Sequence, residues 1–344
     1  MTKSIFREGG RHRVKRIGSD SCSMSIDLPK DTDGRLAREC PDSSCSPGYF
    51  KITPGTGITK NHELAFCPYC RFKAVPNDFT TREQLRYAED TAVREIHAGV
   101  NDLLRDALGV GPSGSKKMGG SLISMELQFR PRTLPLVRRP FEDEVRRDVV
   151  CPHCTLDQTV FGLATWCADC GLNIFMAHVA AELEVTRKMI GDVGRREELL
   201  GNRVAAKDLE NCLEDVVSIF EAAMKAIVRR AFFARGDDGA QVERRLKSIG
   251  NAFQNVERTK LQLKKSLQYD CNENQAWERI GSSFEKRHPV THNLGVIDKK
   301  YLERVQRAEQ EGREVRVLES EVAGLIDDVY DMISVIHRDL VNVG

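Results

Sequence analysis

The fold of this chain is decided by short cysteine pairs, the clearest of which read CPYC at residues 67–70, CPHC at residues 151–154 and CADC at residues 167–170. A tight turn between two thiolates lets both sulfurs reach one metal ion, and a second such turn completes a tetrahedral site. A looser pair, Cys40 and Cys45, supplies the fourth turn. We therefore predict two structural Zn²⁺ sites, each with four cysteine ligands.

The ligands of the two predicted sites form two separate groups along the chain. The first group is Cys40, Cys45, Cys67 and Cys70, and the second is Cys151, Cys154, Cys167 and Cys170. Four thiolates leave no open position for water or substrate, so neither site is expected to be catalytic. The sites either staple segments too small to fold alone or present a docking surface for nucleic acid or protein. His62 and His153 lie close enough in sequence to replace a ligand, although neither is needed.

The overall charge gives no sign of a strongly charged partner. Lys and Arg number 52 against 51 Asp and Glu, and basic residues gather only in residues 1–16, as a disordered tail or a weak phosphate-binding arm. No apolar run approaches the roughly 18 residues that span a bilayer, and the N-terminus lacks the apolar stretch of a secretory signal. We expect a cytoplasmic protein without a membrane partner, whose reduced thiols bind metal rather than form disulfides.

Composition divides the chain into five segments. We predict a disordered basic tail at 1–38, a zinc ribbon plus helix at 39–108, a linker at 109–148, a second zinc ribbon at 149–178 and a helical bundle at 179–344. The helix after the first ribbon is expected to begin at Thr80, with Glu83 completing a capping box. The glycine-rich residues 109–120 are expected to be a flexible connection.

Apolar residues recur at helical spacing throughout the C-terminal half. The longest stripe contains Leu209, Leu213, Val216, Val217, Phe220, Met224, Ile227 and Val228, and the last helix carries Val322, Leu325, Ile326, Val329, Met332, Ile333 and Ile336. An alternating stretch at 312–318 predicts an extended segment before that helix. The fold class is therefore α+β and multidomain: two small zinc ribbons made of short β-hairpins, followed by an all-α antiparallel bundle.

The segment RHPVTHN at residues 287–293 concentrates groups that can do chemistry. Histidine can move a proton near neutral pH, and the Arg287 guanidinium can bind a phosphate and the charge of a transition state. Pro289 is expected to end or kink the preceding helix. Alternatively, the segment is only a polar helix end, in which Arg287 forms an ion pair with Glu285 or Asp298.

An arginine followed after four residues by a histidine, within a helical bundle, resembles the HEPN superfamily. The motif is Arg287-x4-His292, and HNLGVID and GREVRVL follow it before the final helix, so the resemblance covers roughly 200–344. It implies a homodimer whose paired motifs form a metal-independent RNase site, with His292 as base or acid and Arg287 as phosphate ligand. His288 and Asn293 complete the candidate catalytic set. Two departures, His288 after the arginine and Pro289 inside the motif, leave open an inactive or merely dimerising domain.

These observations together predict a metal-independent endoribonuclease, a toxin or anti-phage defence effector, whose zinc ribbons recognise RNA or a partner. A regulatory protein partner is left open. The alternative is a non-catalytic adaptor, in which the ribbons bind nucleic acid or protein and the bundle dimerises the chain. A DNA-binding regulator is disfavoured, because no helix combines a basic face with the pattern of a recognition helix.

Overall fold

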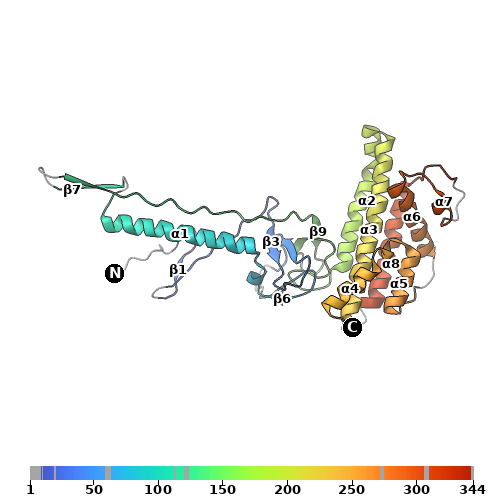
Figure 1. Cartoon of the computed structure of the whole chain (residues 1–344), viewed down its shortest axis with the longest axis horizontal. Coiled ribbons are helices and arrows are strands. Elements are labelled where there is room, and N and C mark those ends of the chain that lie inside the picture. Colours follow the sequence, from blue (N-terminus) through green and yellow to red (C-terminus); the bar gives the residue numbers. More distant parts are fainter. Residues whose placement is uncertain are drawn as a thin grey trace.

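The computed structural model of this protein describes residues 9, 11–18, 21–58, 63–111, 114–119, 124–271, 275–305 and 310–341. A block of helices lies at one end of the molecule, a small sheet lies beside it, and one long helix extends away from the sheet (Figure 1). His62 and, in the N-terminal tail, residues 1–8, 10, 19 and 20 lie outside the described residues. The structure confirms a mixed chain, with small antiparallel sheets first and a mostly helical region after them.

One antiparallel sheet joins the two cysteine groups. Its strand order is β3 (Leu36–Glu39), β4 (Tyr49–Ile52), β10 (Asp157–Val160) and β9 (Arg147–Val150). In the central pair, Phe50 lies opposite Val160. Both side chains are buried in one core with cysteines of both groups. The spacing of the cysteines indicated two ribbons along the chain but not the sheet that unites them.

Short hairpins surround this sheet. Strands β5 (Ala65–Phe66) and β6 (Lys73–Ala74) pair on either side of the CPYC turn. In the segment expected to be disordered, β1 (Lys15–Arg16) and β2 (Cys22–Ser23) form a further antiparallel pair. A short 3-10 helix, η1 (Pro76–Phe79), then leads the chain towards the first long helix.

The first long helix, α1 (Arg82–Leu108), begins one residue later than expected. Thr81, not Thr80, is its N-cap, and Gln84, not Glu83, completes the capping box. The expected cap was wrong because Thr80 closes η1: its backbone N–H and its hydroxyl both donate to the carbonyl of Asn77. Gly109, in the left-handed conformation with φ 60°, ends α1.

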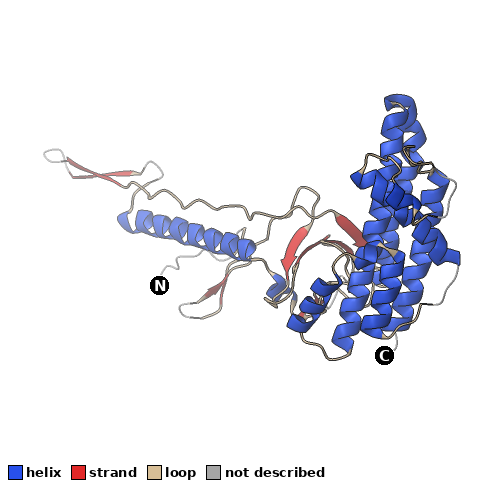
Figure 2. Cartoon of the chain, turned by 45° about the vertical axis from the view of Figure 1, so that its right-hand side comes forward, coloured by secondary structure: helices blue, strands red, loops and turns tan. Residues whose placement is uncertain are grey.

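Helix α1 keeps an apolar stripe on its surface as it extends from the sheet. The stripe contains Leu85, Val93, Ile96, Val100, Leu104 and Leu108, whose exposed fractions run from 37% to 52%. Residues 129–146 run alongside α1 without regular structure (Figure 2). Arg94 and Asn101 hold that segment by donating to the carbonyls of Pro135 and Arg132. Helix α1 is therefore accompanied by the irregular segment 129–146, while its apolar stripe remains exposed.

The glycine-rich connection after α1 is not unstructured over its whole length. Strands β7 (Ser115–Gly119) and β8 (Ser124–Gln128) form an antiparallel hairpin. Lys117 lies opposite Glu126, and a cross-strand pair of opposite charges favours this register. The expectation of a flexible segment at 109–120 was therefore wrong for the residues of β7.

Four long helices form the C-terminal block. They are α2 (Phe175–Leu200), α3 (Asn202–Ala234), α6 (Gln275–His292) and α8 (Glu319–Val341). Their apolar stripes meet in one core, where the ring of Phe220 packs edge-on against Trp277 and Phe284. The helical stripes expected from the sequence in α3 and α8 are confirmed, because all of those residues except Leu209 are buried together.

Shorter elements complete the block. They are α4 (Gly239–Ile249), η2 (Ala252–Gln254), α5 (Val256–Leu267) and α7 (Lys299–Leu302). Of the stretch 312–318, expected to be extended, Glu314 forms an isolated bridge with Val296, Gly312 lies in a turn and residues 315–318 have no regular structure. Among the described residues, no helix combines the length and the apolar character needed to cross a membrane.

A buried histidine connects the sheet to the helical block. His178 on α2 is fully buried, and its Nδ1 accepts a hydrogen bond from the backbone N–H of Ala164 at 2.8 Å. Burial, with the nearby charge of Arg147, lowers the pKa of His178 to about 4. Arg147 on β9 also forms an ion pair with Glu182 on α2. The cysteine-rich half is thus attached to α2 by specific polar contacts.

Candidate metal centres and the site at the end of α6

The first cysteine group forms a compact thiol cluster. The sulfurs of Cys40, Cys45, Cys67 and Cys70 all lie within 4.8 Å of one another. Cys40 Sγ lies 3.7 Å from Cys70 Sγ, and Cys45 Sγ lies 3.6 Å from Cys67 Sγ. Sulfurs bound tetrahedrally to Zn²⁺ at about 2.3 Å stand roughly 3.8 Å apart. The cluster therefore has the size of a zinc site.

The second group repeats this geometry. Cys151, Cys154, Cys167 and Cys170 also lie within 4.8 Å of one another. The closest pairs are Cys151 with Cys170 at 3.7 Å and Cys154 with Cys167 at 3.5 Å. His153 keeps its ring away from the sulfurs, since its Nε2 lies 3.4 Å from the carbonyl oxygen of Asn173. All eight cysteines expected from the sequence are brought together as two groups that can each hold a metal ion.

Each Cys-x-x-Cys turn has the same backbone signature. The residue after the second cysteine adopts the left-handed conformation: Arg71 with φ 64°, Thr155 with φ 64° and Gly171 with φ 66°. This conformation turns the chain so that a later carbonyl receives the N–H of the first cysteine, as Cys67 donates to Phe72. Backbone N–H groups also point at the sulfurs, for example from Asp169 to Cys167. The turns are built to present thiolates.

The Cys40 and Cys45 turn is longer and closes differently. The N–H of Cys40 donates to the carbonyl of Gly48 at 3.0 Å. Gly48 has φ 66°, and a Cβ there would lie only 3.0 Å from the carbonyl oxygen of Cys45. Glycine is therefore required for this turn to bring both sulfurs to the CPYC pair.

The thiols of each group compete for protons. The pKa of Cys67 is raised by hydrogen bonds with the neighbouring thiols, and the bond with Cys40 has the largest effect. Burial raises the pKa of Cys154 to about 11. Four thiolates this close repel one another, and a bound dication removes the repulsion while it displaces the protons. The donor set, its burial and its spacing fit Zn²⁺ with all four positions filled.

The two centres are parts of one unit. The N–H of Thr165 donates to the carbonyl of Pro68, and the N–H of Phe66 donates to the carbonyl of Ala168. The hydroxyl of Tyr69, inside the CPYC turn, accepts from the N–H of Phe161 at 2.9 Å. The turns of each cysteine group are therefore hydrogen-bonded to residues of the other group.

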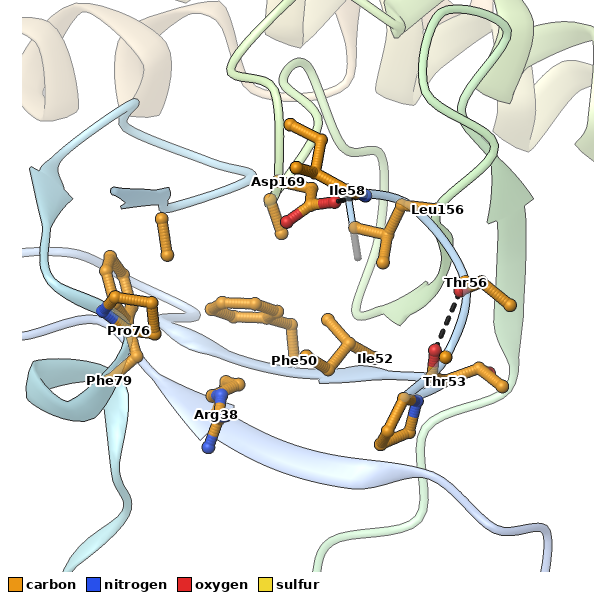
Figure 3. A pocket seen from close by; sticks show the side chains of 14 residues that line it. Arg38, Phe50, Ile52, Thr53, Thr56, Ile58, Pro76, Phe79, Leu156 and Asp169 are labelled. Atoms are coloured by element: carbon orange, nitrogen blue, oxygen red, sulfur yellow. Dashed lines mark hydrogen bonds between the residues drawn. The ribbon is translucent and has the colours of Figure 1, made fainter. Parts of the chain in front are cut away.

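A cavity of about 160 Å³ lies where both groups meet the sheet (Figure 3). The rings of Phe50 and Phe79 meet edge to face at one side of it. The loop at residues 53–58 closes the other side, and the carboxylate of Asp169 accepts a hydrogen bond from the backbone N–H of Ile58. Arg38 also lines the cavity, which lies within the packing that joins the two centres.

The second candidate site lies at the end of α6. The helix continues through the buried Pro289 to His292, so of the two expected effects of this proline, an end or a kink, the helix end was wrong. Pro289 packs beside Val290, and its carbonyl accepts the N–H of both Asn293 and Gly295. Pro289 has no N–H to donate to the preceding turn, and the two bonds that its carbonyl accepts close the C-terminal end of the helix.

Arg287 lies on the inner side of this helix end. Its guanidinium donates to the side-chain oxygen of Gln254 in η2 at 2.8 Å, and its Nε is buried. The partners expected for a simple ion pair are occupied elsewhere, because Glu285 accepts from Asn255 and Arg304. The expected pairing of Arg287 with Glu285 or Asp298 was therefore wrong.

The two histidines share the outer side of the helix end. The rings of His288 and His292 lie 5.3 Å apart, His292 is exposed, and His288 Nε2 lies 4.0 Å from Asp298. Asn293 is exposed and donates to the carbonyl of Val296, which fixes the loop after the helix. The structure thus brings His288, His292 and Asn293 together, while Arg287 is turned towards Gln254.

A third cluster, of two arginines around Trp166, was not predicted from the sequence. The guanidinium carbons of Arg71 and Arg230 lie 4.3 and 5.1 Å from the ring centroid of Trp166. Arg230 also bonds to Nε2 of His337 at 2.9 Å. These residues lie far apart in the chain and no motif connects them, so only the tertiary structure shows the cluster.

Comparison with protein-family models, curated protein sequences and solved structures gave no match for this chain. The three clusters are therefore interpreted from their own geometry. The two thiol groups can bind metal, the end of α6 presents two neighbouring imidazoles, and the Trp166 cluster holds two guanidiniums with no carboxylate partner among the described residues.

Proposed function

We propose that this protein is a metal-independent endoribonuclease of the HEPN type, whose two zinc centres hold an RNA-recognition module. The observation that carries the proposal is the pair of imidazoles at the end of α6, with ring centroids 5.3 Å apart and His292 exposed. Two imidazoles at this spacing can serve as base and acid for one phosphodiester. Arg287 lies on the same helix end and supplies a guanidinium for the phosphate.

The proposed reaction has two proton transfers. His292 removes the proton of a ribose 2′-hydroxyl, and the oxygen attacks the adjacent phosphorus. A second imidazole, that of His288 or of the partner protomer's motif, gives a proton to the leaving 5′-oxygen. The products are a 2′,3′-cyclic phosphate and a 5′-hydroxyl. Arg287 stabilises the charge on the phosphate after exchanging its bond with Gln254 for the substrate.

The proposal includes a homodimer, a cytoplasmic location and a role as a toxin or defence effector, with RNA as substrate. Of these features, the homodimer, the RNA substrate and the toxin or defence role follow from the HEPN resemblance of residues 200–344. In such a dimer each protomer contributes one Arg287-x4-His292 motif to a composite site. A regulatory partner protein would act by controlling access to that site.

The test is cleavage of single-stranded RNA in EDTA. Loss of an acid–base imidazole lowers such rates by about 10² to 10⁴, so His292→Ala should be nearly inactive and Arg287→Ala strongly impaired. His97→Ala, which removes a histidine from α1, is the matched control and should cleave like the parent protein. Elemental analysis after the reaction should still find zinc, since only then does the assay report on a folded protein. Equal rates for the parent and His292→Ala would exclude the proposed mechanism.

A second candidate function is a non-catalytic adaptor. One observation favours it. The Arg287 guanidinium donates a hydrogen bond to Gln254 of the same chain, and its Nε is buried, so it does not face a substrate. In that case the zinc module binds nucleic acid or protein and the helical block dimerises the chain. An adaptor should keep its binding in Arg287→Ala and His292→Ala and lose it when zinc is removed.

A further inference from the structure

Two arginines from different parts of the chain meet one tryptophan. Arg71 follows the CPYC turn of the first metal centre, Trp166 directly precedes Cys167 of the second, and Arg230 lies on α3. Their guanidinium carbons lie 4.3 and 5.1 Å from the centroid of the Trp166 ring. The cluster therefore lies at the junction of both metal centres with the helical block.

Neither arginine has a carboxylate partner within the part of the chain that the structure describes. Other arginines of the block are paired, as Arg229 is with Glu243 and Arg195 with Asp192. The pair therefore lacks a carboxylate partner, and the negative charge beside it comes from the metal-binding turns, since four thiolates with one Zn²⁺ keep a net negative charge.

The histidine beside Arg230 supplies no negative charge. A guanidinium can only donate, so Nε2 of His337 accepts its hydrogen bond and the imidazole is neutral. Burial lowers the pKa of His337 to about 4, and its ring stacks on Phe175. Arg230 is thus held in place by a neutral ring, with its charge left available.

The position of Arg71 adds a second observation. It has a left-handed backbone, where the equivalent position of the CADC turn carries Gly171. The CPHC turn carries Thr155 at this position with the same φ of 64°, so the conformation belongs to the metal-binding turn and fixes the point from which the Arg71 side chain extends. Arg71 is also exposed, so the cluster is open to solvent on that side.

Burial lowers the pKa of Arg230 to about 10, and the charge of Arg71 contributes to this shift. The two guanidiniums therefore repel each other, and an anion between them would remove the repulsion. Phosphate is the anion that matches a guanidinium fork. The indole, over which both guanidiniums lie, keeps the two forks near one another.

We propose that Arg71, Trp166 and Arg230 bind a phosphate group of a single-stranded RNA at the junction between the zinc module and the helical block. The choice of RNA rests on the proposed function. The cluster would hold the strand away from the cleavage site and orient it towards the end of α6.

The test is fluorescence polarisation of a short labelled single-stranded RNA, with the full-length chain in a His292→Ala background so that the RNA stays intact. Arg71→Ala should weaken binding about 10-fold, as loss of a charge-assisted contact does. It should also reduce the slope of log affinity against log salt by about 0.7. Arg195→Ala removes the same charge from an exposed arginine that is paired with Asp192, and it should change neither quantity.

Arg230 is half-buried, so its variants need a folding control. Arg230→Lys keeps the charge and the fold but loses the planar fork, and it should weaken binding with an unchanged melting temperature. Equal affinity and equal salt slope for Arg71→Ala and Arg195→Ala would overturn the proposal. Arg71-dependent binding of a phosphoserine peptide in place of RNA would overturn the assignment to RNA.

The outcomes separate this inference from the proposed function. Cleavage by the parent protein together with Arg71-independent binding would reject the cluster and keep the nuclease. Arg71-dependent binding without any cleavage by the parent protein would keep the cluster and reject the nuclease.

Discussion

Acidification should destabilise this protein through the buried His178. Its pKa is about 4 in the folded chain and about 6.5 when unfolded. The unfolded chain therefore binds more protons between these values, and stability is lost as the pH falls through this window. Because one pKa unit is worth about 1.4 kcal/mol, His178 alone should remove about 2 kcal/mol between pH 7 and pH 5.

The surroundings of His178 support this direction. Burial dominates the shift, and Arg147 adds a positive charge. Glu182 lies 3.6 Å from Nε2, which favours the protonated ring, but it already forms an ion pair with Arg147. The N–H of Ala164 also donates to Nδ1, so the neutral ring is the one that this backbone contact requires.

The assay compares the parent protein with His178→Asn, whose side-chain oxygen can replace Nδ1 as acceptor for Ala164. Urea unfolding followed by helical circular dichroism gives the free energy of unfolding of both proteins at pH 7 and pH 5. Acid release of zinc affects both equally, so it cancels in the difference. The advantage of the parent protein should shrink by about 2 kcal/mol at pH 5. An advantage of the same size at both pH values would refute the reasoning.

Three further predictions concern the metal centres and the sheet. Elemental analysis should find two zinc ions per chain in the parent protein and one in Cys151→Ser, whose helical circular dichroism signal should be largely kept. Two zinc ions per chain in the variant would contradict the assignment. Gly171→Ala should lower the free energy of unfolding by about 2 kcal/mol, measured by thermal unfolding, because its Cβ would lie 2.8 Å from the ring of Phe66 and the residue has φ 66°. The control is Gly191→Ala in α2, where a Cβ meets open space, and it should be neutral or stabilising. Lys51→Ala should lower the free energy of unfolding, measured in urea, by about 3–5 kcal/mol. The substitution leaves the partly buried carboxylates of Asp31 and Glu142, which lie 2.9 and 3.2 Å from Lys51 Nζ, without their cation.

The parts of the fold that rest on local pattern could be predicted from the sequence. Cysteine spacing identified all eight candidate ligands, because a Cys-x-x-Cys turn is a local structure. Helical periodicity likewise identified α3 and α8, whose apolar residues are separated by only three or four positions. The cap of α1 was missed by one residue, since Thr80 and Thr81 are both acceptable caps and only η1 decides between them.

The parts that depend on distant contacts could not be predicted. Strands β4 and β10 are four residues each, and nothing local indicates that Phe50 lies opposite Val160. The stripe on α1 predicted an apolar side but not that Leu85 would remain 52% exposed. Arg287 looked free to face a cleft, and its bond with Gln254 depends on how η2 packs against α6.

The most direct test of the central claim is end-group analysis of RNA cleaved by the parent protein in EDTA, with zinc retention verified. The account predicts 2′,3′-cyclic phosphate and 5′-hydroxyl ends, formed at least about 100-fold more slowly by His292→Ala. Absence of cleavage by the parent protein, 3′-hydroxyl ends, or equal rates for both proteins would contradict it.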